Sequence, residues 1–262
     1  MRSGGDGGHF RDRQGVICKA EVTELCGRFS LAISPEKLAE LFKTINFLDF
    51  PQRFNIAPTQ PVVGIRAAEN HDRFGEMFRW GLVPFWAKDL KIGQRLTNAR
   101  AETLKEKPSF RGAYKYRRCL IPSSGFYEWK TIDRQKQPFY IRLRDRSPMA
   151  MAGLYEIWTH PEGSEIRTAT IITTRANDMM APLHHRMPVL LDSGDYDRWL
   201  DPSNQTSKGL DPLLKPYPSE KMEAYRVSAY VSRTGQEGPR CIAPVELEGD
   251  APAGKPAQGE LF

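Results

Sequence analysis

The sequence predicts an α+β fold, a single domain with a largely antiparallel, barrel-like β core and peripheral helices. Strand-like runs outnumber helical segments and do not alternate with them regularly, which favours this class over a parallel α/β sheet. The chain has 262 residues, of which 40% are hydrophobic, so it is long and apolar enough to bury a substantial core. We find no internal repeat or linker between residue 26 and about residue 247, and we therefore expect residues 26–247 to form one catalytic and binding domain.

The first element expected is a helix over residues 35–45. Ser34 followed by Pro35 is typical of an N-cap with proline at the first helical position, and apolar residues then recur at helical spacing. Short helices are also expected near residues 99–104 and 195–200. Strands are expected at residues 62–67, 118–121, 139–143, 150–154, 167–174 and 188–191.

Both ends of the chain are expected to lie outside this domain. Residues 1–25 are polar, glycine-rich and aperiodic, which predicts a disordered leader that is removed from the active protein. Residues 248–262 are dominated by Pro, Gly, Ala and charge, which predicts a flexible tail. The leader lacks the apolar centre of a secretory signal, and no run of eighteen apolar residues exists, so we expect a cytoplasmic protein with no membrane contact.

Charge and cysteine content narrow the function classes only slightly. The net charge is +6, and because residues 1–25 are neutral overall, the basic excess belongs to the rest of the chain. Such an excess fits a polyanion partner and equally an ordinary basic enzyme. The four cysteines, Cys18, Cys26, Cys119 and Cys241, lack the C-x-x-C spacing of a zinc site or a disulfide framework, so we expect no metal and no cofactor.

Four segments concentrate reactive side chains between strand-like flanks: residues 26–29, 97–102, 124–129 and 184–188. Taken singly, each has an ordinary structural explanation. Cys26 fits a small buried side chain, Asn98 a helix cap, Glu128 a solvated strand residue and His184 a packed surface imidazole. Together they supply a nucleophile, an amide, a carboxylate and an imidazole, which are the parts needed for covalent catalysis with proton transfer. Their spacing does not show that they meet in space.

Six motifs occur in the order found in the SOS response-associated peptidase (SRAP) family, which the chain resembles from Cys26 to about Val245. They are Cys-Gly-Arg-Phe (26–29), Arg-Phe-Asn-Ile-Ala-Pro (53–58), Trp-Gly-Leu-Val-Pro-x-Trp (80–86), Asn-Ala-Arg-x-Glu-Thr (98–103), Gly-Phe-Tyr-Glu-Trp (125–129) and His-x-Arg-Met-Pro (184–188). The resemblance implies an α+β domain with a barrel-like core and a positively charged DNA groove, in agreement with the fold class expected from the residue pattern. With DNA as the partner, we expect a monomer that is associated with the nucleoid.

The resemblance also implies the chemistry of Cys26. This residue resembles the family nucleophile, which acts as the amino-terminal residue once the preceding chain is removed and then offers both an α-amine and a thiol. An α-amine with a pKa of about 7.7–8.0 is partly unprotonated at neutral pH and can form an imine with the aldehyde of an abasic site in single-stranded DNA. The thiol then closes a five-membered thiazolidine, so an internal cysteine would not serve.

Three further residues resemble catalytic positions of the family. Glu128 resembles the carboxylate that acts as general acid and base, and His184 the histidine that helps to open the sugar and moves protons. Asn98 resembles the polar residue that orients the nucleophile. We expect the neighbouring His185 to point to the opposite face of an extended segment.

The resemblance assigns other residues to DNA binding. Trp86 and the segment Asn55–Pro58, with Asn55 and Pro58 at its ends, match the part of the groove that supports a splayed nucleotide. Trp129 is expected in the core, and Ser232, where relatives often carry Asn, receives no role. The positions that match phosphate contacts are Arg28, Arg100 and Arg186.

The start of the chain departs from the family pattern. In most relatives the cysteine follows the initiator methionine, whereas here Leu25 precedes Cys26. Either the thiol attacks the preceding carbonyl and cleaves the Leu25–Cys26 bond, with Glu128 or His184 handling protons, or the start is misassigned. A start at Val22 would still leave three residues ahead of the cysteine.

Two other functions fit the same residues: an amino-terminal-cysteine amidohydrolase or peptidase acting on a substrate other than DNA, and a non-covalent single-stranded DNA-binding module in which Cys26 is structural. The arginine-rich flanks argue against the first. The tail adds a possible partner, because Gln258, Leu261 and Phe262 resemble the Gln-x-x-Leu-Phe motif that docks on replication sliding clamps.

Overall fold

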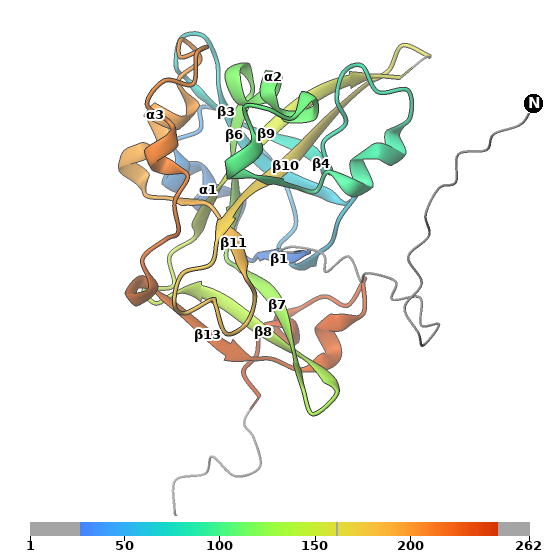
Figure 1. Cartoon of the computed structure of the whole chain (residues 1–262), viewed down its shortest axis with the longest axis vertical. Coiled ribbons are helices and arrows are strands. Elements are labelled where there is room, and N and C mark those ends of the chain that lie inside the picture. The colour runs from blue at the N-terminus through green and yellow to red at the C-terminus, as the bar shows by residue number, and fades with distance from the viewer. Residues whose placement is uncertain (1–26, 161, 246–262) are drawn as a thin grey trace, which may run out of the picture.

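Two β-sheets form the framework of the computed structural model, which describes residues 27–160 and 162–245 (Figure 1). The expected leader and tail, and Cys26 itself, lie outside the described residues. The helices are α1 (Pro35–Phe42), α2 (Pro108–Tyr116) and α3 (Tyr196–Leu200). The strands are β1 (Arg28–Leu31), β2 (Arg53–Ile56), β3 (Pro61–Ala67), β4 (Arg73–Trp80), β5 (Asn98–Arg100), β6 (Arg118–Ser123), β7 (Gly125–Ile132), β8 (Gln135–Leu143), β9 (Met149–Thr159), β10 (Glu165–Arg175), β11 (Arg186–Pro188), β12 (Leu190–Leu191) and β13 (Met222–Arg226).

The larger sheet closes on itself as a barrel. Its strands follow the order β10, β4, β3, β6 and β9, and β9 then pairs with β10 to complete the ring. Every pairing in the ring is antiparallel except that of β10 with β4. Because the ring is closed, none of its five strands is an edge strand of the barrel. The expectation of a largely antiparallel, barrel-like α+β fold is confirmed.

The smaller sheet has the order β13, β8, β7, β1 and β2, and all its pairings are antiparallel. One of its faces contributes Phe29 and Phe126 to the main core that it shares with the barrel. The other face carries a second cluster with Tyr127 and Tyr140 at its centre. In Figure 1 this sheet lies below the barrel, and the segment after β13 folds back against it.

The helices follow the local signals only in part. Ser34 caps α1 by accepting a hydrogen bond from the Lys37 backbone N–H at 3.3 Å, as the Ser-Pro pair predicts. The helix nevertheless stops at Phe42 rather than at residue 45, because Lys43 turns left-handed and Ile45 donates its backbone N–H to the Arg73 carbonyl at the edge of β4. No helix in the described part of the chain is long and apolar enough to cross a membrane.

One expected helix is absent, and several observed elements were not predicted. Residues 99–104 form the end of β5 and a single 3-10 turn instead of a helix, because Asn98–Arg100 pair with β10. The sequence pattern predicted no helix at α2 and no strand at β1, β2, β4 or β13. The expected strands at residues 62–67, 118–121, 139–143, 150–154 and 167–174 all lie within observed strands, and α3 lies within the helix expected near residues 195–200.

Candidate active site and nucleic-acid surface

Glu128 is a buried carboxylate beside the start of β1. Its residue is only 3% exposed. In the β1–β7 ladder Arg28 is paired with Tyr127 and Phe29 with Phe126, so the same register continued by one step puts Gly27 across from Glu128. Side chains alternate between the faces of a strand, and Glu128 therefore lies on the same face of β7 as the core residue Phe126.

The alignment of β1 with β7 and β8 is fixed by a close contact at Gly125. A Cβ at this position would lie 2.2 Å from the ring of Tyr140, so only glycine lets the tyrosine cross the strand. The Tyr140 hydroxyl then lies 2.7 Å from the Ser30 hydroxyl on β1. These contacts fix β1, β7 and β8 relative to one another at Gly125, three residues before Glu128.

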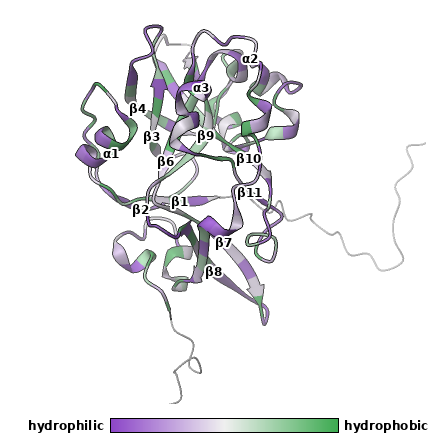
Figure 2. Ribbon diagram, turned by 90° about the vertical axis from the view of Figure 1, so that its left-hand side faces the viewer, coloured by the Kyte–Doolittle hydropathy of each residue, from purple (hydrophilic) through white to green (hydrophobic). Residues whose placement is uncertain are grey.

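Asn98 and His184 flank the same end of β10. Asn98 lies on β5 and is paired with Ile171 of β10, and His184 lies in the turn that leads from β10 to β11. Figures 1 and 2 both place β11 close to β1 and β7. The Asn98 segment is also linked to β1, because Phe29 packs edge-on against Trp80 at 5.1 Å and the Trp80 indole N–H donates to the Thr97 carbonyl at 2.9 Å.

The imidazole of His184 is held as a neutral ring. Its Nδ1 lies 3.0 Å from the Arg186 backbone nitrogen, from which it accepts in one tautomer, and 3.2 Å from the Arg186 carbonyl oxygen, to which it donates in the other. Burial lowers the pKa of His184 and favours this neutral form. Nε2 is buried and has no hydrogen-bond partner among the described residues. Nε2 is therefore the ring nitrogen left to contact a substrate, as a donor or an acceptor according to the tautomer.

The sequence pattern predicted that His185 would point away from His184, and this prediction is wrong. The two ring centroids are 4.3 Å apart and the rings are inclined by 33°. The alternation of an extended strand does not apply here, because both residues precede β11 and lie outside any strand. His185 is exposed, whereas His184 is half-buried.

The three expected phosphate-binding arginines have different surroundings. Arg100 is exposed at the end of β5. Arg186 is 9% exposed, and its two terminal nitrogens donate to the carboxylate of Glu102 at 2.6 and 2.8 Å. Arg28 donates to Asn55 Oδ1 at 2.8 Å and to the Thr234 hydroxyl at 2.9 Å. Of the three guanidinium groups, that of Arg100 is the most open to a ligand.

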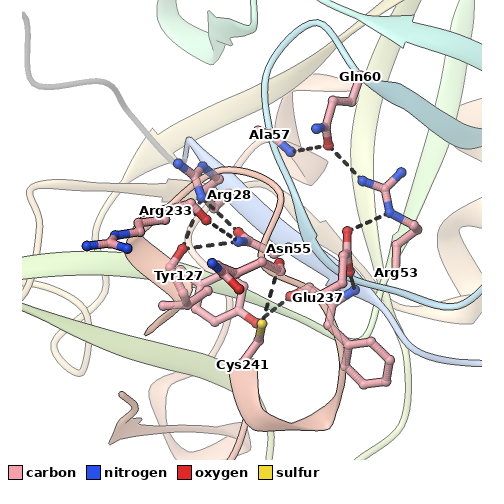
Figure 3. Close-up of polar contacts among 12 residues, drawn as sticks. Arg28, Arg53, Asn55, Ala57, Gln60, Tyr127, Arg233, Glu237 and Cys241 are labelled. Carbon is pink, nitrogen blue, oxygen red and sulfur yellow. Dashed lines mark hydrogen bonds and ion pairs between the residues drawn. The ribbon is translucent and has the colours of Figure 1, made fainter. Parts of the chain in front are cut away.

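Asn55 is fully buried behind Arg28 (Figure 3). Its side-chain N–H groups donate to the carbonyls of Val231 and Arg233, both at 3.1 Å, while its oxygen accepts from Arg28. Asn55 therefore reaches a nucleotide only indirectly, by holding Arg28 and the loop around residues 231–233. Pro58, at the other end of the same motif, is half-buried.

Trp129 is half-buried rather than a core residue, so this expectation is wrong. The guanidinium of Arg28 lies 5.9 Å from its ring, and its indole N–H donates to the Ser232 hydroxyl at 3.0 Å. Ser232, which the sequence gave no role, therefore ties the loop after β13 to β7. Ser232 and Trp129 are more than one hundred residues apart in the sequence, so no local pattern could indicate this contact.

Trp86 lies in an exposed aromatic and basic loop. Its side chain is 50% exposed, and that of the preceding Phe85 is 68% exposed. Gly81 and Gly93 hold this loop against the end of β4: a Cβ on either glycine would lie within 2.5 Å of the other's carbonyl oxygen. The exposed cationic residues on the loop are Lys88, Lys91 and Arg95.

The described cysteines are not candidate nucleophiles. Cys119 and Cys241 are both buried free thiols. Burial raises the pKa of each thiol and so disfavours the reactive thiolate. The described residues also contain no cluster of three or more His, Cys, Asp or Glu side chains that could hold a metal ion.

Fold and site together define a single-domain barrel protein with a buried carboxylate and a neutral imidazole near the junction of its two sheets. The family model for SOS response associated peptidase (SRAP) matches residues 25–234. The chain belongs to the SRAP family.

Relatives and solved structures agree with this membership. The chain is 44% identical over 222 residues to abasic site processing protein YoqW of Bacillus subtilis, covering 83% of this chain and 99% of the relative. It is 42% identical over 212 residues to abasic site processing protein YoaM of the same organism, covering 79% and 93%. A crystal structure of a Bacteroides thetaiotaomicron protein superposes with a TM-score of 0.75 at 30% identity, covering 84% of this chain and all of the other.

Proposed function

We propose that this protein acts in the response to DNA damage by capturing abasic sites in single-stranded DNA as a covalent thiazolidine on Cys26. The observation that carries the proposal is the buried carboxylate of Glu128 opposite Gly27, because Gly27 is the residue to which Cys26 is bonded. Relatives that share 42–44% of their residues with the chain are named abasic site processing proteins, which supports the same substrate.

The reaction needs no cofactor. The α-amine of an amino-terminal Cys26 adds to the aldehyde carbon C1′ of the opened sugar, and loss of one water molecule gives an imine. The thiol then adds to the imine carbon, its proton passes to the imine nitrogen, and the thiazolidine ring closes. Aldehyde and aminothiol thus become thiazolidine and water, with no change in oxidation state.

The described side chains can carry the protons of these steps. Glu128 takes a proton from the amine and returns it to the departing hydroxyl, a role that suits a carboxylate shielded from solvent. In the tautomer with its proton on Nε2, His184 donates that proton to the ring oxygen of the sugar as it opens, and the C1′ hydroxyl gives up its own proton to water as the aldehyde forms. Asn98, on β5 beside Ile171 of β10, orients the nucleophile.

Exposure of the amine requires removal of residues 1–25. In the proposed self-cleavage the Cys26 thiol attacks the Leu25 carbonyl, the amide becomes a thioester with a free amine on Cys26, and one water molecule hydrolyses the thioester. Glu128 or His184 moves the protons. Misassignment of the start would shorten the segment to be removed without changing the capture reaction.

The exposed aromatic and basic loop supports the DNA-binding half of the proposal. Trp86 is half-exposed and so accessible for stacking on a base, and Arg100 presents a guanidinium for a phosphate. Phosphate contact by Arg28 and Arg186 and nucleotide support by Asn55 and Pro58 remain predictions.

A denaturing gel tests the proposal against its two alternatives. The purified protein is first weighed by mass spectrometry to establish that it starts at Cys26, and is then incubated with single-stranded DNA containing one abasic site. We expect a denaturation-resistant species whose mass is that of protein plus DNA minus one water. Cys26→Ala should lose this species and keep weak single-strand binding, whereas the buried-thiol control Cys119→Ala should crosslink normally.

The other outcomes are equally definite. An adduct that persists in Cys26→Ala would contradict the proposal. Binding without any adduct by protein that starts at Cys26 would favour the non-covalent module, and neither binding nor adduct would favour an amidohydrolase that acts on another substrate.

A further inference from the structure

Glu102 and Arg186 form a clasp that joins the two segments carrying Asn98 and His184. Glu102 lies in the 3-10 turn directly after β5, four residues beyond Asn98. Arg186 begins β11, two residues after His184. Their two parallel hydrogen bonds, of 2.6 and 2.8 Å, connect positions 84 residues apart in the chain.

The clasp crosses the end of β10. Besides its bonds to Glu102, Arg186 donates to the Thr173 carbonyl at 2.6 Å. Thr173 is paired with Arg100 of β5 on one side and with Pro188 of β11 on the other. Arg186 therefore fixes the spacing of β5 and β11 on either side of β10, and with it the spacing of the two candidate site segments.

The same residue sets the orientation of the imidazole. Both backbone groups of Arg186 face His184 Nδ1, the N–H at 3.0 Å and the carbonyl oxygen at 3.2 Å, so displacement of Arg186 would move the ring and with it Nε2. A bidentate arginine–carboxylate pair defines position more strictly than a single hydrogen bond does.

We propose that Glu102 is a positioning residue of the active site, which acts through Arg186 to hold the His184 imidazole toward the substrate. This inference rests on the proposed abasic-site chemistry and adds to it a residue for which neither the motifs nor the proposed chemistry gave a role. The side chain of Glu102 is 53% exposed, so it is accessible to substitution without opening the core.

Glu102 also neutralises a charge beside the imidazole. Burial lowers the pKa of His184 most, the hydrogen bond with the Arg186 backbone raises it, and the charges of His185 and of the Arg186 side chain lower it further. The other charged residues to be considered for the pKa of His184 are Glu102 and the exposed Arg100 of the β5 segment, and the buried Glu128 of the smaller sheet. The hydrogen bonds from Arg186 lower the pKa of Glu102, which stays ionised at neutral pH. Removing its charge would leave that of Arg186 uncompensated and lower the pKa of His184 further.

The test compares Glu102→Gln with wild type, with the charge-retaining Glu102→Asp and with Glu106→Gln, a control that neutralises an exposed carboxylate one turn further on. Two readouts are used. The pH dependence of adduct formation at saturating abasic DNA reports the reaction, and the proton resonance of the His184 ring in DNA-free protein reports its position and pKa independently of activity.

We expect Glu102→Gln to slow adduct formation between about 10- and 100-fold, the scale of a displacement near 1 Å at a catalytic group. It should shift the His184 resonance and lower its pKa, while single-strand affinity and its salt dependence stay as in wild type. Glu102→Asp should keep the pKa of His184 near the wild-type value, and Glu106→Gln should behave as wild type throughout.

A wild-type rate of adduct formation together with an unmoved His184 resonance in Glu102→Gln would overturn the inference. A reduced salt dependence of DNA binding with an unmoved resonance would also overturn it, and would make Glu102 part of the DNA contact instead. A shifted resonance in a protein that forms no adduct even as wild type would remove the proposed function and leave the positioning of His184 by Glu102 supported.

Discussion

Replacement of Asn55 by alanine distinguishes a structural residue from a DNA contact. The change removes three hydrogen bonds of a fully buried side chain, two neutral ones to the Val231 and Arg233 carbonyls and one to the charged Arg28. Both carbonyls keep another donor, from Arg28 and from the Gln236 backbone, so neither is left bare. At about 1 kcal/mol for a neutral bond and about 1.5–3 kcal/mol for one to a charged group, the expected loss of unfolding free energy is about 3–5 kcal/mol.

For a domain of this size that loss lowers the melting temperature on the order of 10 °C. Adduct formation should slow, because Arg28 and the loop around residues 231–233 lose their anchor beside β1. Single-strand affinity should fall no further than in Arg28→Ala, because Asn55 reaches a nucleotide only by holding Arg28. Thermal unfolding and binding of fluorescent single-stranded DNA measure the two quantities separately.

Asn46→Ala is the matched control. Asn46 likewise bridges backbone groups, accepting from the Gly75 N–H at 2.8 Å and donating to the Gly75 carbonyl at 2.9 Å, but it lies beside β4 of the barrel sheet, whereas Asn55 lies on β2 of the smaller sheet. We expect it to cost about 2 kcal/mol and to leave adduct formation unchanged. An unaltered melting temperature in Asn55→Ala together with a marked loss of DNA affinity would refute the structural assignment and make Asn55 a nucleotide contact.

Three further predictions concern the site and the tail. Arg100→Glu should weaken binding to any single strand and reduce the slope of log affinity against log salt by about 0.7, the value for one phosphate contact, and an unchanged slope would assign it to the solvated surface. Glu128→Gln should slow both leader removal and adduct formation, whereas native rates of both would exclude it from the mechanism. A fluorescent peptide of residues 251–262 should bind purified sliding clamp and lose binding when Leu261 and Phe262 are both replaced by alanine; equal binding by the two peptides, or none, would end the clamp hypothesis.

The local patterns were informative where one short stretch contained the whole signal. Residues 62–65 of one expected strand and residues 150–154 of another are apolar and buried, so their composition alone marks them as core strands. The start of α1 was equally local, because the cap is a bond between residues three apart in sequence.

Elements with one polar face gave no such signal. The strand β4 carries charges at Arg73, Glu76 and Arg79, and its apolar residues are too few to mark it as a strand without the neighbouring β3. The helix α2 contains Gly112 and several aromatic residues with modest helix propensity, so packing against β6 and β9 stabilises it more than its local sequence does.

The sequence by itself determined the fold class, the family and the residues that carry the candidate chemistry, because each is recorded in short contiguous motifs. Only the tertiary structure decided what those residues touch. Arg186 is paired with Glu102 across 84 positions, and Asn55 with the carbonyls of Val231 and Arg233 across 176 and 178. Such partners are set by how the strands close into sheets, and no local propensity or spacing encodes which distant group a buried polar side chain will meet.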